Sequence, residues 1–372
     1  MRFHNHLSEQ KLSAILSKLP KPFTKHSTKD ELALCLGAAM YTPGTRMQLA
    51  DELLDKKFPQ LTTLIIDLED AVADIDLERA LENTYSTLVK IDAFLTARME
   101  EAELPLLFVR VRTPKHFEEV VAKLRPVQHI LTGYVMPKFE LENGAAFLHI
   151  LKRERAKGYE LYGMPVFETA NLLYKENRLA QLKNLHELLA EHRDMILNVR
   201  VGATDFLGVY GIRRKRHQTL YDVMVLRDGL SDILNVFGRQ DDGFVVSGAV
   251  WEYFDAPNEE SQSGAVATKT LTAALAGLQR ECEFDQLNGF QGKTVIHPTH
   301  VQFVNAYYTV THEDYEDALA ILNHTHDAGV LKSTSGNKMN EMKPHQYWAV
   351  RIIRQAEMYG VLQSQKTYLD LL

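Results

Sequence analysis

The amino-acid sequence predicts an α/β protein built as a (β/α)8 TIM-like barrel. From residue 32 to residue 298, eight short apolar runs alternate with stretches of helical length and helical periodicity. None of these runs is followed by a Gly-x-Gly-x-x-Gly turn, which favours a closed barrel over an open doubly wound sheet. The length of 372 residues leaves room for attachments at both ends of such a barrel.

The eight predicted strands are short and apolar, and each lies before a predicted helix. The strands are expected at residues 32–40, 61–68, 104–112, 130–138, 161–168, 195–202, 243–250 and 293–298. The helices between them are expected at residues 47–57, 77–99, 116–124, 145–157, 178–191, 221–237 and 266–281.

The alternation divides the chain into three segments. Residues 1–32 form a predicted N-terminal helical extension, and residues 33–300 form the barrel, the predicted catalytic domain. Residues 301–372 form a C-terminal helical segment that could be exchanged between subunits. The polar residues 329–340 are interpreted either as a plain linker or as a flap over an active site.

Composition excludes several classes of function. The net charge of −7 argues against a general binder of nucleic acids or anionic membranes. No apolar run approaches the roughly 18 residues of a membrane span, and no secretory leader is recognisable. Cys35 and Cys282 are far apart in apolar surroundings, as expected of reduced core thiols. We therefore expect a cytoplasmic protein.

Three acidic residues follow the second predicted strand in the run Asp67-Leu68-Glu69-Asp70. The carboxyl ends of barrel strands are where ligands bind. Three neighbouring negative charges need a metal ion or a basic side chain close by. Asp70 or Asp74 could instead cap the next helix.

Other strand ends carry residues of complementary chemistry, and the barrel fold would bring all of them to one mouth. Glu168 follows the fifth strand, Asp205 follows the sixth and His297 ends the eighth. The basic side chains expected at the same mouth are Arg46, Arg110, Arg112 and Lys138.

Glu168 and Asp205 are the predicted metal ligands, because two carboxylates with water and substrate oxygens are typical of an open Mg²⁺ site. Arg110 is suited to clamp a substrate carboxylate through two hydrogen bonds. A metal ion beside that carboxylate would polarise a carbonyl, which suits carbon–carbon bond cleavage or formation. Each residue has a structural alternative: Asp205 could cap a helix, and Glu168 could pair with Arg110 or Lys138.

Several strings of the sequence resemble the citrate lyase beta-subunit-like group of the HpcH/HpaI aldolase superfamily. In order along the chain they are Pro43-Gly44-Thr45-Arg46, Asp67-Leu68-Glu69-Asp70-Ala71-Val72, Val109-Arg110-Val111, Met136-Pro137-Lys138, Glu168-Thr169-Ala170, Gly202-Ala203-Thr204-Asp205 and Gly289-Phe290-Gln291-Gly292-Lys293-x-x-Ile296-His297-Pro298. The extra length is similar to the longer carbon–carbon lyase branch associated with tellurium-resistance gene clusters.

The resemblance implies an oligomeric lyase, a trimer or hexamer, that depends on Mg²⁺ or Mn²⁺ and uses a small carboxylate or acyl-thioester substrate. By position, Glu168 and Asp205 would hold the metal ion, and Arg110 would hold the carboxylate of a 2-oxo acid. Asp67 and Glu69 would lie beside the reacting centre as catalytic groups. Arg46 and Lys138 would be substrate-binding groups.

Some positions depart from the resemblance. Met339-Asn340-Glu341 stands where relatives carry Met-Ile-Asp, so a coenzyme A thioester stays open as the substrate. The segment near residues 254–264 also extends beyond a typical relative. The basic run at residues 213–217 is interpreted either as a solvated face or as a receptor for a phosphorylated substrate tail.

Three functional hypotheses follow. The first is a Mg²⁺-dependent lyase or aldolase that makes or breaks a bond between a 2-oxo acid and an enolate. The second is a Schiff-base aldolase that uses Lys138 or Lys293. The third is a non-catalytic barrel that serves as a subunit of a biosynthetic complex.

Overall fold

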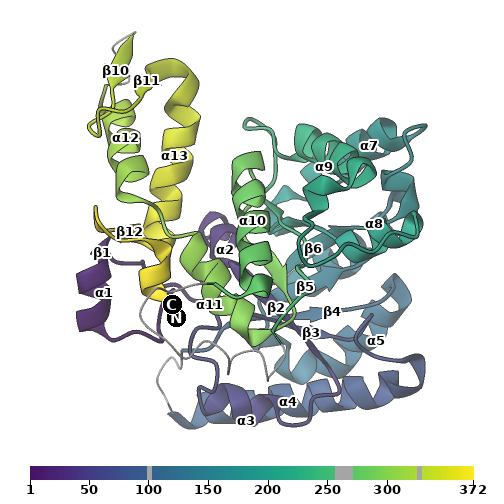
Figure 1. Cartoon of the computed structure of the whole chain (residues 1–372). Coiled ribbons are helices and arrows are strands. Elements are labelled where there is room, and N and C mark those ends of the chain that lie inside the picture. Colours follow the sequence, from purple (N-terminus) through teal and green to yellow (C-terminus); the bar gives the residue numbers. More distant parts are fainter. Residues whose placement is uncertain (99–102, 256–270, 325–328) are drawn as a thin grey trace.

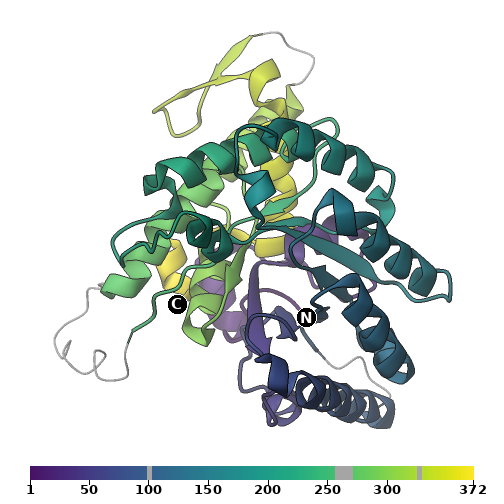
Figure 2. The same ribbon diagram turned by 90° about the vertical axis from the view of Figure 1, so that its right-hand side faces the viewer.

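The computed structural model describes residues 1–98, 103–255, 271–324 and 329–372. Its centre is one sheet of eight parallel strands in the order β8-β7-β6-β5-β4-β3-β2-β9. Helices lie on the outside of these strands (Figure 2). The predicted (β/α)8 barrel is therefore confirmed.

The barrel strands are short and follow one another around the sheet. They are β2 (Ala38–Pro43), β3 (Thr63–Asp67), β4 (Leu106–Arg110), β5 (Gly133–Met136), β6 (Tyr162–Phe167), β7 (Val199–Val201), β8 (Val246–Ser247) and β9 (Lys293–Val295). The two edges of the sheet meet where Gly248 bridges to Lys293. Gly248 N donates to Gly292 O at 3.0 Å, and Thr294 N donates to Gly248 O at 3.0 Å, so backbone hydrogen bonds close the barrel.

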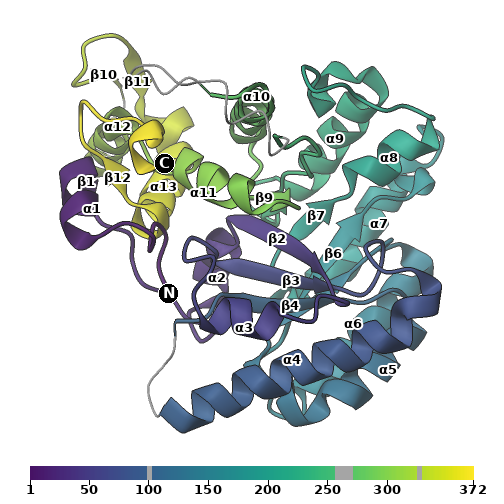
Figure 3. The ribbon, with the colours of Figure 1, turned by 60° about the horizontal axis from the view of Figure 1, so that its bottom comes forward.

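The helices of the barrel wall pack outside the strands, as α4, α5 and α6 do in Figure 3. The helices up to β9 are α1 (Glu9–Ile15), α2 (Lys29–Cys35), α3 (Leu49–Leu54), α4 (Leu77–Arg98), α5 (Pro114–Leu124), α6 (Leu141–Arg155), α7 (Arg178–Ala190), α8 (Ala203–Val209), α9 (Met224–Phe237) and α10 (Ala273–Asn288). After β9 come α11 (Pro298–Tyr307), α12 (His312–Asn323) and α13 (Met342–Tyr359).

The first predicted strand is wrong in its amino-terminal half, because residues 29–35 form α2. Thr28 accepts from the backbone of Glu31 while the Glu31 side chain accepts from the backbone of Thr28, a capping box that starts a helix. Gly37 then turns the chain with a φ of 49°, and β2 begins at Ala38. The apolar run at residues 32–40 thus spans a helix end, a turn and a strand.

Other differences are shifts of boundary. The eighth predicted strand is shorter than expected, since Pro298 occupies the first turn of α11. Residues 329–340 are mostly a hairpin of β10 (Val330–Lys332) and β11 (Met339–Glu341). The predicted start of a helix at residues 266–270 and most of the extension at residues 254–264 lie outside the described residues.

Segments near the two chain ends lie side by side beside the barrel (Figure 1), where α1 and β1 (Leu16–Lys18) neighbour β12 (Val361–Leu362). Leu16 of β1 pairs with Leu362 of β12, and α1 shares a small apolar core with the C-terminal residues. Helices α12 and α13 and the hairpin form an arm that projects away from the strands. Within the described residues, no helix combines the length and the apolar character needed to cross a membrane.

Candidate active site

Seven charged side chains gather at the carboxyl ends of β3 to β7, and we call them the mouth cluster. They belong to Asp67, Glu69, Asp70, Arg110, Lys138, Glu168 and Asp205. Parallel strands deliver them to the same end of the barrel, as the sequence predicted. Five acids face two bases, so the cluster carries excess negative charge.

Asp67 and Arg110 form the buried base of the cluster. They end the neighbouring strands β3 and β4 and stand in register. Arg110 Nε and Nη2 each donate to one carboxylate oxygen of Asp67 at 2.6 Å. The same oxygens accept from the backbone N–H groups of Glu69 and Ala71, at 2.9 and 3.2 Å. Asp67 is thereby locked in place, and it orients both Arg110 and the acidic loop.

Arg110 also reaches the two other acids of the loop. Its Nη1 lies 2.9 Å from Glu69 Oε2 and 3.2 Å from Asp70 Oδ2. Lys138 Nζ pairs with Glu69 from the other side. Asp70 is therefore an ion-pair partner of Arg110 rather than the cap of a helix, since α4 begins only at Leu77.

Glu168 and Asp205 form the part of the cluster where negative charge is least compensated. Glu168 Oε1 accepts from the backbone N–H of Lys138 at 2.8 Å, and Lys138 Nζ lies 3.7 Å from Asp205 Oδ1. Burial, followed by repulsion from Asp205, raises the pKa of Glu168 to about 8. Burial is also the main cause that raises the pKa of Asp205. A cation between these two acids would relieve both effects.

This pair fits a divalent ion that keeps open positions. Among the described residues, no group of three or more His, Cys, Asp or Glu side chains is arranged to hold a metal ion. Two carboxylates of raised pKa, one of them partly exposed to solvent, are the hard oxygen donors that Mg²⁺ or Mn²⁺ accepts together with water and substrate oxygens.

Two residues next to the mouth cluster, Gly202 and Arg112, help to position its acids. A Cβ built on Gly202 would lie 2.5 Å from the Cβ of Glu168, so the absent side chain at this position lets Glu168 approach. Arg112 holds the acidic loop from outside: its Nε donates to Leu68 O at 2.7 Å and its Nη2 to Val72 O at 2.6 Å. Arg112 is thus the member of the 110/112 pair that does not enter the cluster.

Two predicted site residues point elsewhere in the structure. Arg46 pairs with Glu52 on α3 at 2.7 Å and lies over the ring of Phe58, at 5.7 Å from the ring centre. His297 stacks on Phe254 with 4.4 Å between ring centres. Neither has a contact with the mouth cluster among the described residues.

A second group of charges lies at the seam where β8 meets β9, and we call it the seam cluster: Lys293, Glu281, Asp285 and Arg214. Lys293 Nζ lies 2.9 Å from Glu281 Oε1 and 2.7 Å from Asp285 Oδ2. Arg214 pairs with Glu281 and with Glu252. All four members are almost fully buried. One residue of the basic run at 213–217 is therefore part of the interior.

Sequence analysis missed two groups inside the barrel, Arg200 on β7 and Tyr41 on β2. The guanidinium of Arg110 lies over the ring of Tyr41, with its Cζ 5.0 Å from the ring centre. The Cζ of Arg200 lies 5.8 Å from the centre of the same ring. A charged residue in the middle of the apolar run Val199-Arg200-Val201 was the available signal.

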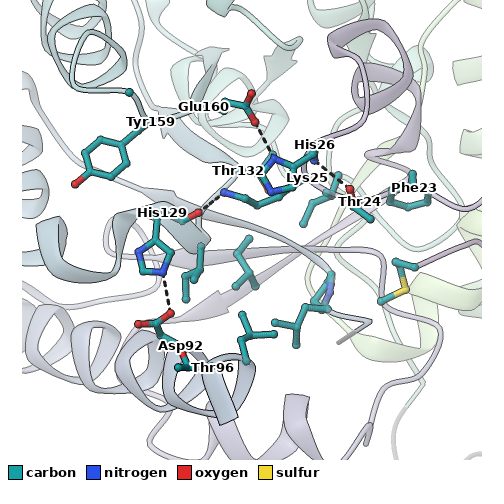
Figure 4. Close-up of a pocket in the computed structure, with 18 residues that line it drawn as sticks. Phe23, Thr24, Lys25, His26, Asp92, Thr96, His129, Thr132, Tyr159 and Glu160 are labelled. Atoms are coloured by element: carbon teal, nitrogen blue, oxygen red, sulfur yellow. Dashed lines mark hydrogen bonds and ion pairs between the residues drawn. The ribbon is translucent and has the colours of Figure 1, made fainter. Parts of the chain in front are cut away.

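A cavity of about 710 Å³ lies at the opposite end of the barrel, beside the amino ends of β4, β5 and β6 (Figure 4). Four of its ionisable groups form two pairs, His26 Nδ1 with Glu160 at 2.8 Å and His129 Nε2 with Asp92 at 2.8 Å. A fifth, Lys25, donates to the backbone carbonyl groups of His129 and Leu131. Residues at this end of a barrel usually serve stability. The chemistry of the molecule is therefore concentrated at the mouth.

Comparison with known proteins agrees with this geometry. Residues 30–361 match the model of a family described as C–C bond lyase of the TIM-barrel fold. The chain therefore belongs to this family of carbon–carbon bond lyases. No curated protein matches the chain by sequence.

Solved structures with the same fold include a citrate lyase and a protein named CitE. A citrate lyase from Burkholderia xenovorans LB400 is 15% identical with a TM-score of 0.61, covering 90% of this chain and 96% of the other. CitE from Mycobacterium tuberculosis, in complex with magnesium, acetoacetate and coenzyme A, is 18% identical with a TM-score of 0.52, covering 86% and 97%.

Malate synthase from Haloferax volcanii, in a ternary complex with pyruvate and acetyl-CoA, is a third structure of this fold. It is 12% identical with a TM-score of 0.51, and the match covers 83% of this chain and 88% of the other. At such identities the likeness concerns the fold.

Proposed function

We propose that this enzyme cleaves or forms the bond between a 2-oxo acid and an enolate, with Mg²⁺ held by Glu168 and Asp205. The observation that carries the proposal is the incompletely compensated pair of acids at the mouth, where burial, followed by repulsion from Asp205, raises the pKa of Glu168 to about 8. When bound, the ion would supply Lewis-acid polarisation of the oxo group.

In the direction of cleavage, the reaction begins with a hydroxy acid whose hydroxyl carbon also carries a carboxylate. A base takes the hydroxyl proton, the C–O bond becomes a carbonyl, and the electrons of the breaking C–C bond pass to the other fragment as an enolate. Protonation of the enolate completes the cleavage, and the reverse sequence forms the bond. The second fragment is a carboxylic acid or its thioester.

Glu69 is the proposed base. Its side chain lies between Arg110 and Lys138, and burial raises the pKa of its carboxyl, which brings it closer to neutral pH. Asp67 is fully engaged by Arg110 and by two backbone N–H groups. We therefore assign Asp67 to positioning Arg110 and the acidic loop.

Arg110 and Lys138 supply the positive charge on the substrate side of the cluster. Lys138 is 44% exposed, so its ammonium group can meet a substrate carboxylate. Arg110 is 10% exposed and would turn only one edge of its guanidinium to the substrate. Arg46 would contact the substrate only after its ion pair with Glu52 breaks.

Exchange of the C-terminal arm between subunits stays a prediction.

The test combines metal binding with turnover. Calorimetry should show one Mg²⁺ ion per wild-type chain, and Glu168→Gln and Asp205→Asn should each weaken its binding at least tenfold. Turnover is measured with acetyl-CoA, and with acetate in parallel, each mixed with pyruvate or glyoxylate; the formation of the hydroxy acid or of its thioester is recorded. Both variants should lower turnover at least a hundredfold, about 2.7 kcal/mol.

Glu52→Gln is the matched control, because Glu52 is a buried acid that pairs with Arg46 and Lys57 away from the mouth. It should leave Mg²⁺ affinity within twofold of the wild type. Unchanged Mg²⁺ affinity in Glu168→Gln and Asp205→Asn would contradict the proposed metal site.

The Schiff-base alternative requires a neutral lysine. Hydrogen bonding and charge attraction from Glu69 raise the pKa of Lys138 against the effect of burial, and Asp285 and Glu281 do the same for Lys293. Both lysines are therefore held as ammonium ions, which are not nucleophiles. Borohydride in the presence of pyruvate should trap no adduct on either residue.

A further inference from the structure

Arg200 is a charged residue in the interior of the barrel. It stands in register with Val166 of β6, while the next pair of the register is Phe167 and Val201. Phe167 packs against Phe237 of α9 outside the sheet, with 4.8 Å between ring centres. Because side chains alternate along a strand, Arg200 points to the inside, where it is 1% exposed.

The guanidinium of Arg200 is short of partners. Its Nη2 donates to Thr294 Oγ1 at 2.6 Å. Its Nε and Nη1 are buried and have no hydrogen-bond partner among the residues that the structure describes. No acid pairs with it there. A buried charge without a counter-ion is costly, and each buried N–H group left without an acceptor adds to the cost.

Other buried arginines of this chain do not share this deficit. Arg178 is 4% exposed and donates to Asp232, to Asp228 and to Leu173 O, at 2.6, 2.7 and 2.9 Å. Arg110 and Arg214 each pair with at least two acids. The unused donors of Arg200 are therefore a feature of this one position rather than of buried arginines in the fold.

Arg200 lies close to the mouth cluster. The ring of Tyr41 has Arg110 at 5.0 Å and Arg200 at 5.8 Å from its centre. Arg200 is also two residues before Gly202, which directly follows β7 and packs on Glu168. Tyr41 and Thr294, the two neighbours of its guanidinium, are partly exposed although they lie in barrel strands. This layer is therefore partly open to solvent beside Tyr41 and Thr294, while Arg200 itself is covered.

We propose that Arg200 binds a second carboxylate of the substrate, so that the 2-oxo acid handled by this enzyme is a dicarboxylic one. This inference rests on the proposed function for the reacting end of the substrate. Arg110 and the metal ligands would hold the carboxylate and oxo group at the mouth. The distal carboxylate would reach down beside Tyr41 and accept from the unused donors of Arg200, aided by Thr294.

The test compares two stable hydroxy acids that differ by one carboxylate, malate and lactate. Binding is measured by calorimetry on the full chain, once with Mg²⁺ and once with EDTA. Wild type should bind malate at least tenfold more tightly than lactate. Arg200→Met, which keeps the volume and removes the charge, should reduce this preference to less than threefold. Arg200→Lys should retain an intermediate preference.

A second readout separates a binding role from a structural one. Since Arg200 is buried without a counter-ion, Arg200→Met should raise the melting temperature in the absence of ligand. Arg178→Met is the matched control, because it removes the arginine that pairs with Asp228 and Asp232. This variant should have a lower melting temperature than the wild type and should keep the preference for malate.

The inference would be overturned if the wild type bound malate no more tightly than lactate, or if Arg200→Met kept the preference of the wild type. Failure of the proposed function would look different: Mg²⁺ would not bind, and the affinities with Mg²⁺ and with EDTA would be equal. The effect of Arg200→Met on the ratio of malate to lactate affinity would still be measurable in that case.

Discussion

The mouth cluster and the seam cluster are both groups of charges at one barrel, yet they are built in opposite ways. The seam cluster sets Lys293 and Arg214 against Glu281 and Asp285, and solvent does not reach it. The mouth cluster has five acids and two bases, and Asp70, Lys138 and Asp205 are 54%, 44% and 31% exposed. One group is neutral and closed, whereas the other is charged and open.

This difference separates stability from function. A buried ion-pair network such as the seam cluster, which joins β9, α10 and Arg214, stabilises the fold and leaves no charged group free to bind a ligand. An open group with excess negative charge has raised carboxyl pKa values and an affinity for cations. Two buried arginines differ in the same way: Arg178 donates to acidic partners, whereas two donors of Arg200 have no partner among the described residues.

The largest effect on stability is expected at the seam. Lys293→Met leaves Glu281 and Asp285 buried without their shared cation, which should cost about 3–5 kcal/mol of unfolding free energy. Urea denaturation measures this loss. A change below about 1 kcal/mol would show that the seam cluster contributes little to the stability of the fold.

A tenfold or larger loss of Mg²⁺ affinity is expected from Gly202→Ala. The new Cβ would lie 2.5 Å from the Cβ of Glu168 and must push that side chain away. Gly208→Ala is the control on the same helix α8, since a Cβ there has no neighbour within 4 Å among the described residues. If calorimetry gave the two variants equal Mg²⁺ affinities, the assignment of Glu168 as a metal ligand would be contradicted.

The next effect is a dependence of Mg²⁺ affinity on pH. With a pKa of about 8, Glu168 binds a proton in the folded protein at pH 7 and must release it to the solvent when a metal ion binds. Affinity should therefore rise up to tenfold per pH unit from pH 6 to pH 8, and then level. Calorimetry in buffers of different ionisation enthalpy counts the protons released; no release at pH 7 would contradict the raised pKa.

The same pKa has a consequence for the metal-free protein. Between pH 4.5 and pH 8 the folded state binds a proton at Glu168 that the unfolded state does not, so this group makes stability fall as pH rises through that window. Glu168→Gln should flatten this part of the stability profile. A wild-type profile and a variant profile of equal slope would contradict it.

The smallest effect is expected on the exposed part of the basic run. Arg213→Ala and Lys215→Ala should change the melting temperature by less than about 1 °C and KM by less than twofold, because both side chains face solvent. Arg214→Met, in contrast, should destabilise the fold through Glu281 and Glu252. A large KM effect of Arg213→Ala would support a receptor for a phosphorylated substrate tail.

The sequence predicted the barrel and the group of residues at its mouth because both follow from local patterns. Apolar runs mark strands, and parallel strands bring their carboxyl ends together, so Asp67, Arg110, Lys138, Glu168 and Asp205 could be expected to meet. The helix at residues 29–35 was missed because an apolar run of this length fits either a strand or a helix, and the Thr28–Glu31 cap decided it.

Pairing between distant residues could not be predicted. Nothing local shows that Arg46 turns to Glu52 or that Arg214 enters the seam cluster. Nor does it show that two donors of Arg200 have no partner among the described residues. These outcomes depend on which side chains share a face once the sheet has closed. The spacing of residues within a strand gives the face of a side chain but not its neighbour across the barrel.

The most direct test of the metal site is an anomalous diffraction measurement on crystals soaked with Mn²⁺, a stand-in for Mg²⁺ with the same preference for oxygen ligands. The excess negative charge at the mouth predicts one strong peak in contact with the carboxylates of Glu168 and Asp205, and no such peak in Glu168→Gln. A mouth without a peak, or a peak that persists at the same place in Glu168→Gln, would contradict the assignment of these two acids as the metal ligands.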